Sequence, residues 1–117
     1  MKIQFEFNKQ RFTATLENSG ATRELVKMLP LALSVEDYGH NEKIAYLPIK
    51  LPDDGSVRFK NEVPGDICYY APWGNLVLYY AAYNYSSGLV RLGRLDGGIE
   101  PLLTKGKFPL HIQLLSK

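Results

Sequence analysis

The chain has 117 residues, 45% of them hydrophobic and 22% charged, which fits one globular domain and argues against a disordered chain. Its formal net charge is +2, with basic residues scattered among acidic ones, so no basic surface for nucleic acid is expected. Cys68 is the only cysteine, which excludes an internal disulfide and a cysteine-based zinc cluster, and we expect a buried, inert thiol in preference to a reactive nucleophile.

No apolar stretch approaches the roughly 20 residues that a membrane span requires. Met1-Lys2 leads directly into an alternating pattern and not into a signal peptide. We therefore expect a cytoplasmic location, although a chain trimmed of its leader would look the same.

The first residues alternate between apolar and polar with a period of two, on both sides of a turn at residues 8–10. The apolar members are Ile3, Phe5, Phe7, Phe12, Ala14 and Leu16. This pattern predicts a β-hairpin with one buried face.

A helix is predicted next, with either Ser19 or Thr22 capping its start and Pro30 ending it. Three apolar residues have the i, i+3, i+4 spacing of a helix; they are Leu25, Met28 and Leu29. We expect this helix to plug an open end of a curved sheet, with Leu25 and Leu29 buried there.

The rest of the chain is read as short strands separated by turns and loops. The predicted strands are residues 31–35, 44–47, 66–71, 76–82, 89–95 and 108–114. Between them we predict a polar bend at 36–42, an extended segment at 48–52, a turn at 53–56, an exposed excursion up to residue 65, a turn at 72–75, a loop at 84–88 and a short helical turn at 99–103. Seven or eight short strands with one substantial helix favour a closed barrel.

Two long stretches resemble the small bacterial cyclophilin-like proteins. Residues 65–76, GDICYYAPWGNL, look like the family's Gly-Asp-Ile-x-Tyr-Tyr-x-Pro-Trp-Gly-Asn-Leu motif, and residues 88–96, GLVRLGRLD, match as well. Shorter matches lie at residues 29–31, 36–38 and 42–48. The resemblance implies a mainly β fold over residues 1–117 as one domain: a closed cyclophilin-like β-barrel of about eight strands with one capping α-helix and a short helical turn.

The resemblance implies fold more strongly than activity. True cyclophilins are peptidyl-prolyl isomerases with the signature Arg-x-x-x-x-Phe-Met-x-Gln, and no such run exists here. Their later Trp-Leu-Asp-Gly-x-His stretch is also absent, because residues 94–98, RLDGG, match it only superficially.

Aromatic residues concentrate in the second half of the chain. Adjacent residues on a strand face opposite sides, so one member of Tyr69-Tyr70 and one of Tyr79-Tyr80 can face the core while the other meets solvent or a groove. The candidate ligand-binding residues are Tyr46, Tyr70, Trp73, Asn75, Tyr79 and Tyr85. The alternative is that the tyrosines pack the barrel and that Trp73 caps its core.

Arg91 and Arg94 are the candidate catalytic residues, since an arginine that hydrogen-bonds near a proline nitrogen weakens amide resonance. The alternative is a pair of solvated strand arginines. His40 and His111 have no Cys or carboxylate at ligand spacing, so neither a metal site nor a cofactor is expected.

Two functions remain open on these grounds. The first is a non-catalytic module that binds an extended peptide, with or without proline, or a small molecule in an aromatic groove. The second is a divergent peptidyl-prolyl isomerase that uses Arg91 or Arg94. A scaffold for a protein partner is a third reading, while no nucleic acid or membrane partner is expected and the oligomeric state stays open.

Overall fold

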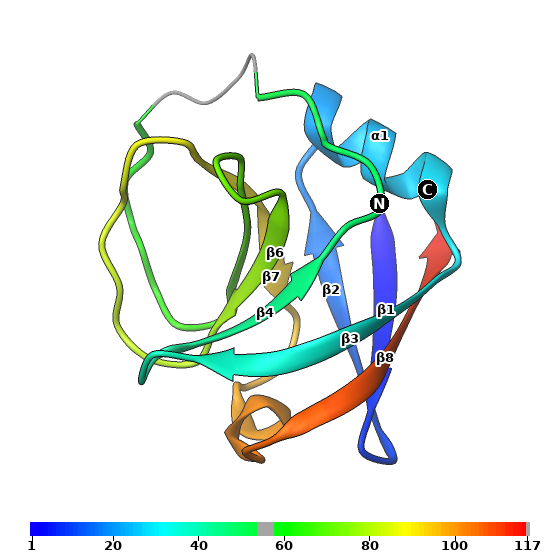
Figure 1. Cartoon of the computed structure of the whole chain (residues 1–117). Coiled ribbons are helices and arrows are strands. Elements are labelled where there is room, and N and C mark those ends of the chain that lie inside the picture. The colour runs from blue at the N-terminus through cyan, green and yellow to red at the C-terminus, as the bar shows by residue number, and fades with distance from the viewer. Residues whose placement is uncertain (54–57, 117) are drawn as a thin grey trace.

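The computed structural model describes residues 1–53 and 58–116, and it is a closed antiparallel β-barrel (Figure 1). The strands are β1 (Lys2–Phe7), β2 (Gln10–Leu16), β3 (Leu31–Tyr38), β4 (Glu42–Tyr46), β5 (Asp66–Tyr70), β6 (Asn75–Tyr79), β7 (Leu89–Leu95) and β8 (Lys107–Ser116). They follow one another around the barrel in the order β1-β2-β7-β5-β6-β4-β3-β8, and β8 pairs with β1 to close it. The predicted fold class is confirmed.

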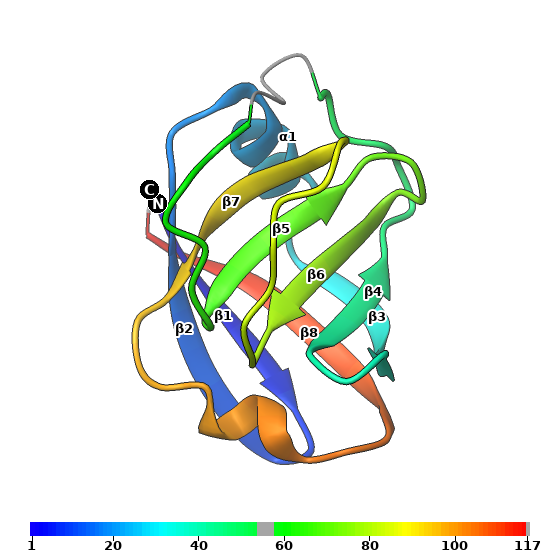
Figure 2. The ribbon, with the colours of Figure 1, turned by 90° about the vertical axis from the view of Figure 1, so that its left-hand side faces the viewer.

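Two helices lie at opposite ends of the barrel, α1 (Gly20–Met28) and the 3-10 helix η1 (Glu100–Leu103) (Figures 1 and 2). Ser19 is the N-cap of α1, and Thr22 completes a capping box because the backbone N–H of Ser19 donates to Thr22 Oγ1 at 2.9 Å. Both predicted capping residues therefore contribute. Leu25 is buried and Leu29 packs against the core, so α1 plugs its end of the barrel as expected.

Alternate strand residues fill the barrel, and a second apolar cluster lies outside it. Tyr69 faces the interior, whereas its neighbours Cys68 and Tyr70 face outward. The outer cluster consists of Cys68, Val77, Tyr79, Tyr83 and Leu89. The connection between β6 and β7 passes over it on the outside of β5 (Figure 2). Cys68 is buried as expected, and this burial raises the pKa of its thiol to about 12.

The predicted polar bend at residues 36–42 is wrong in its first half. β3 continues to Tyr38, and the chain turns only at residues 39–41, where Gly39 has a φ of +62°. Asp37 lies opposite Lys43 across β3 and β4, and its Oδ1 accepts from Lys43 Nζ at 2.9 Å. Charged residues therefore occupy the last part of β3, so this part lacks the apolar alternation that predicts a strand.

Other boundaries move by smaller amounts. β6 ends at Tyr79 and not at residue 82, because its neighbour β4 starts at Glu42 and offers no partner beyond the Glu42–Tyr79 pair. Most of the turn predicted at 53–56 lies outside the described residues. Residues 58–64 form no helix or strand, as the predicted excursion requires. Within the described ranges, no helix has the length and apolarity needed to cross a membrane.

Candidate functional site

An aromatic pocket of about 260 Å³ lies on the outer face of the barrel, where β3, β4, β5 and β6 adjoin. Its lining residues are Tyr38, Glu42, Tyr70, Trp73, Tyr79 and Ser86. Three of the predicted ligand-binding residues are thus brought together: Tyr70, Trp73 and Tyr79.

Trp73 is held at the tip of the tight β5–β6 turn. The backbone N–H groups of Trp73 and Gly74 both donate to the Tyr70 carbonyl oxygen, at 3.2 and 2.9 Å, and Gly74 has a φ of +74° that favours glycine. The turn folds the indole back over the sheet between two tyrosines. Its ring centroid lies 5.3 Å from that of Tyr38 and 5.5 Å from that of Tyr70, with interplanar angles of 83° and 78°. Trp73 nevertheless remains 47% exposed.

The register of β3, β4 and β6 determines where the other strand residues of the pocket lie. Glu42 lies opposite Tyr38 in the β3–β4 pair and opposite Tyr79 in the β4–β6 pair, so all three side chains share the outer face. Tyr79 stacks on Tyr83, with ring centroids 3.6 Å apart. Burial raises the pKa of Tyr79 and also that of Glu42, because each loses hydration of its charged form.

The other three predicted ligand-binding residues lie outside the pocket lining. Tyr46 is 51% exposed on β4, and Asn75, opposite it on β6, is only 1% exposed. The Asn75 side chain donates to the Leu76 carbonyl oxygen at 3.1 Å, and its Oδ1 has no partner among the described residues. Tyr85 packs edge-on against Phe59, at 5.1 Å between ring centroids.

The two candidate catalytic arginines belong to a separate charged cluster around Asp66. This carboxylate is fully buried and accepts from Arg94 Nε at 2.6 Å, Tyr83 Oη at 2.7 Å and the Val63 backbone N–H at 3.1 Å. Arg91 Nη1 lies 3.7 Å from its second oxygen. Asp66 therefore has its acceptor capacity filled from three directions.

Arg91 is engaged by several further groups. Its Nε donates to Glu17 Oε2 at 3.2 Å, its Nη1 donates to the Lys60 carbonyl oxygen at 2.8 Å, and its guanidinium lies over the Phe59 ring at 4.7 Å. Arg94 Nη2 also reaches a carbonyl of this segment, that of Asn61 at 3.3 Å. The arginines thus fasten residues 59–61 to the barrel.

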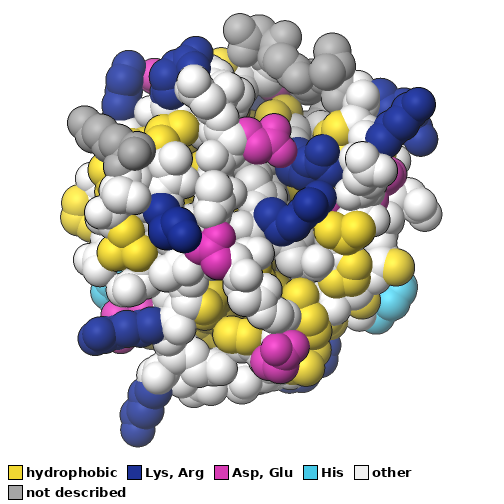
Figure 3. Space-filling view, turned by 180° about the vertical axis from the view of Figure 1, so that it is seen from behind, with side chains coloured by type: hydrophobic (Ala, Val, Ile, Leu, Met, Phe, Trp, Pro, Cys, Tyr) yellow, Lys and Arg dark blue, Asp and Glu magenta, His cyan; other side chains and the backbone are white. Residues whose placement is uncertain are grey.

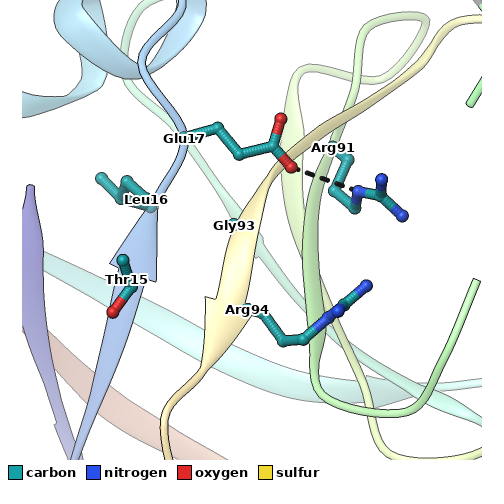
Figure 4. A pocket seen from close by; sticks show the side chains of 6 residues that line it. All are labelled: Thr15, Leu16, Glu17, Arg91, Gly93 and Arg94. Atoms are coloured by element: carbon teal, nitrogen blue, oxygen red, sulfur yellow. Dashed lines mark hydrogen bonds and ion pairs between the residues drawn. The ribbon is translucent and has the colours of Figure 1, made fainter. Parts of the chain in front are cut away.

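A second hollow of about 260 Å³ lies beside these arginines and is lined by Thr15, Leu16, Glu17, Arg91, Gly93 and Arg94 (Figure 4). Figure 4 shows Glu17 reaching across to Arg91, while Arg94 points toward the neighbouring loop. Gly93 forms its floor at a close approach of β2 and β7, where an added Cβ would lie 2.9 Å from Leu16 Cα. Of the charges that border the hollow, Glu17 and Arg91 pair with each other, and Arg94 pairs with Asp66.

Charged side chains and possible metal ligands also lie elsewhere on the surface, over the residues that the structure describes. On the face opposite Figure 1, acidic and basic side chains are interspersed among hydrophobic ones (Figure 3). His40 and His111 are both exposed. Across residues 1–53 and 58–116, no three His, Cys, Asp or Glu side chains gather closely enough to hold a metal ion.

Sequence reasoning missed Tyr38, Glu42 and Ser86 in the aromatic pocket and the role of Asp66 in the charged cluster. The predicted bend at residues 36–42 includes Tyr38 and Glu42, and a bend does not place the two side chains on one face of a sheet. A hairpin with its turn at Gly39 would have placed them opposite each other, and that turn signal was present in the sequence. No local signal points to Ser86, and none points to the pairing of Asp66 with Arg94, because those two residues lie 28 positions apart.

A family model described as the cyclophilin-like family matches residues 5–113. Among solved structures, the chain is similar to the solution structure of a hypothetical protein from Archaeoglobus fulgidus, with a TM-score of 0.68 and 14% sequence identity. That match covers 97% of this chain and 93% of the other, and at this identity it bears on the fold alone. No curated protein matches the sequence.

Proposed function

The chain belongs to the cyclophilin-like family, and we propose that it is a non-catalytic binding module that holds a peptide or a small ligand in its aromatic pocket. The observation that carries this proposal is the exposure of Trp73 between Tyr38 and Tyr70. A half-exposed indole beside two phenols is a large apolar contact surface with polar edges, the composition typical of recognition sites.

Proline-containing peptides are the peptide class that such a surface favours. Extended proline-rich segments have little conformational entropy to lose, and they dock onto grooves lined by aromatic side chains. The tight turn supports this function because it holds Trp73 in place before any ligand arrives.

The geometry of the arginines weighs against the alternative of a divergent isomerase. An arginine that assists prolyl isomerisation must direct a free N–H toward the proline nitrogen. Arg91 and Arg94 instead donate to carboxylates and to the carbonyl oxygens of residues 60 and 61. Both side chains therefore have a structural task that accounts for their positions.

Ligand binding can be followed directly, because Trp73 is the only tryptophan of the chain. Titration with a series of proline-containing peptides should change the fluorescence of Trp73 in a saturable way. Tyr70→Ala should weaken this binding by about tenfold or more, as expected for an aromatic anchor. Tyr46→Ala is the matched control, since Tyr46 is an exposed tyrosine outside the pocket.

A proline-peptide isomerisation assay tests the alternative. We expect background activity that does not change when both Arg91→Ala and Arg94→Ala are introduced into a chain that still folds, as judged by circular dichroism. Activity above background that depends on either arginine would replace the binding module with an enzyme. A chain whose Trp73 emission responds to no peptide or small molecule would contradict the proposal itself.

A further inference from the structure

The aromatic pocket contains one acidic group, Glu42, which has no counter-ion among residues 1–53 and 58–116. Glu42 lines the pocket with four aromatic side chains and Ser86, and among the described residues no Lys or Arg lines it. Within the same residues, no ion pair or side-chain hydrogen bond reaches the Glu42 carboxylate. The pocket is therefore acidic as well as aromatic.

Two other shielded carboxylates of the barrel are paired: Asp66 accepts from Arg94, and Asp37 accepts from Lys43. Glu42 is half-buried, and burial raises its pKa because no partner offsets the lost hydration. A partly desolvated carboxylate without a partner is an attachment point for a cation supplied from outside the chain.

The rings around Glu42 have the arrangement that suits a cation. Tyr38 and Tyr70 both stand nearly perpendicular to Trp73, so the three rings form walls at right angles instead of a flat stack. Aromatic faces attract cations through the ring quadrupole, and cages of such rings recognise quaternary ammonium groups. A carboxylate or phosphate ligand would meet repulsion from Glu42.

We propose that this pocket binds a methylated ammonium group, with Tyr38, Tyr70 and Trp73 as its walls and Glu42 as its counter-ion. The inference rests on the proposed function, since it names the ligand class of the same site. A methylated ammonium suits the pocket better than a primary one because its methyl groups pack on the rings and it binds water less strongly. A volume of about 260 Å³ lies below the range for whole drug-sized ligands, so the pocket accommodates one head group.

The test uses the emission of Trp73 with three probes on the full chain. Tetramethylammonium chloride should produce a saturable change, neopentyl alcohol as a neutral probe of similar shape should produce much less, and sodium chloride at equal ionic strength should produce none. Glu42→Gln should weaken tetramethylammonium binding by about tenfold. Glu24→Gln, which removes the same charge on α1, should leave it unchanged.

Two further arms distinguish the source of the group. A peptide that carries trimethyllysine is compared with the same peptide carrying unmodified lysine, and choline represents a free small molecule. Tighter binding of the trimethylated peptide than of choline assigns the group to a side chain, and the reverse order assigns it to a metabolite-sized ligand.

The outcomes separate the two proposals. Equal binding of neopentyl alcohol and tetramethylammonium, or an unchanged affinity in Glu42→Gln, overturns the cation inference and leaves the aromatic site standing. A response to proline peptides without any response to tetramethylammonium does the same. If the emission of Trp73 responds to none of the probes while the thermal unfolding of the variants is unchanged, both the binding site and the cation inference are overturned.

Discussion

Two regions of the same barrel wall use charge in opposite ways. In the charged cluster, Asp66 is fully buried and accepts hydrogen bonds from Arg94 and Tyr83. In the aromatic pocket, Glu42 is shielded by tyrosines and lacks any such partner among the described residues. The first region holds a loop to the barrel, and the second leaves interaction capacity open to solvent.

The difference teaches that residue type alone does not identify a site on this fold. Arg91 and Arg94 are candidate catalytic residues by sequence, but their N–H groups donate to other residues of the chain. Glu42 lies in the predicted bend and is no candidate by sequence, although it lines the aromatic pocket.

The largest effect is expected where the charges are paired. Asp66→Ala leaves Arg94 without its closest partner and Tyr83 without an acceptor, and it should lower the free energy of unfolding by about 3–5 kcal/mol. Urea denaturation measures this loss. Asp96→Ala is the comparison, because Asp96 is more exposed and should cost about 1 kcal/mol. Similar losses in the two variants would contradict the structural role of the Asp66 cluster.

A smaller stability effect is expected in the aromatic pocket. Trp73→Ala removes two edge-to-face contacts of a half-exposed ring and should cost about 1–2 kcal/mol in urea denaturation. The same change should abolish ligand binding, which NMR titration of the remaining pocket residues would follow. A variant that binds the ligand as well as the parent does would contradict the site.

Removing the unpaired charge should stabilise the protein slightly. The pKa of Glu42 is raised in the folded state, so ionisation of Glu42 costs folding free energy at pH values above that pKa. Glu42→Gln should therefore unfold at a slightly higher urea concentration than the parent at pH 7. The gap should close as the pH falls through the pKa of Glu42, because both side chains are then neutral.

The pocket lining holds no other carboxylate among the described residues, since its remaining members are three tyrosines, Trp73 and Ser86. A difference in urea stability that disappears at acidic pH therefore reports the titration of Glu42. A gap that is constant between pH 3 and pH 7, taken as about the span of a carboxylate titration, would contradict its desolvated position.

The smallest effect is expected just outside the pocket. Tyr46→Ala changes an exposed side chain and should alter the free energy of unfolding by no more than about 0.5 kcal/mol. Trp73 fluorescence should respond to ligands in this variant as it does in the parent. A loss of ligand response would extend the site beyond the six residues that line the pocket.

The barrel itself was predictable because its signal is local. Period-two alternation in residues 3–7 and 12–16 fixes which side chains face inward, and the same parity predicts that Tyr69 and Tyr70 face opposite sides, as they do. Tyr70 and Tyr79 were candidates because of that parity, and Trp73 was a candidate because of its place in the turn at residues 72–75. The extent of β3 did not, since the ion pair between Asp37 and Lys43 breaks the apolar pattern at a barrel end.

The structural role of Arg91 and Arg94 could not be predicted from the sequence for a different reason. Arg91 and Asn61 are 30 residues apart, and Arg94 and Asp66 are 28 apart, so only the folded chain brings them together. A charged residue on a strand reads the same in sequence whether it is solvated or paired. Only the three-dimensional arrangement of the strands and loops distinguishes these two cases, and the amino-acid composition does not contain that information.

The closure of the barrel has a consequence for recognition. Every strand pairs with a neighbour on each side over at least part of its length, so a visiting peptide finds no strand with one edge wholly free to extend. The backbone amides of such a peptide stay hydrated or bond to side chains. Discrimination among ligands then depends on the few groups that enter the aromatic pocket. Such a receptor would tolerate wide variation in the flanking residues and discriminate sharply at a single position.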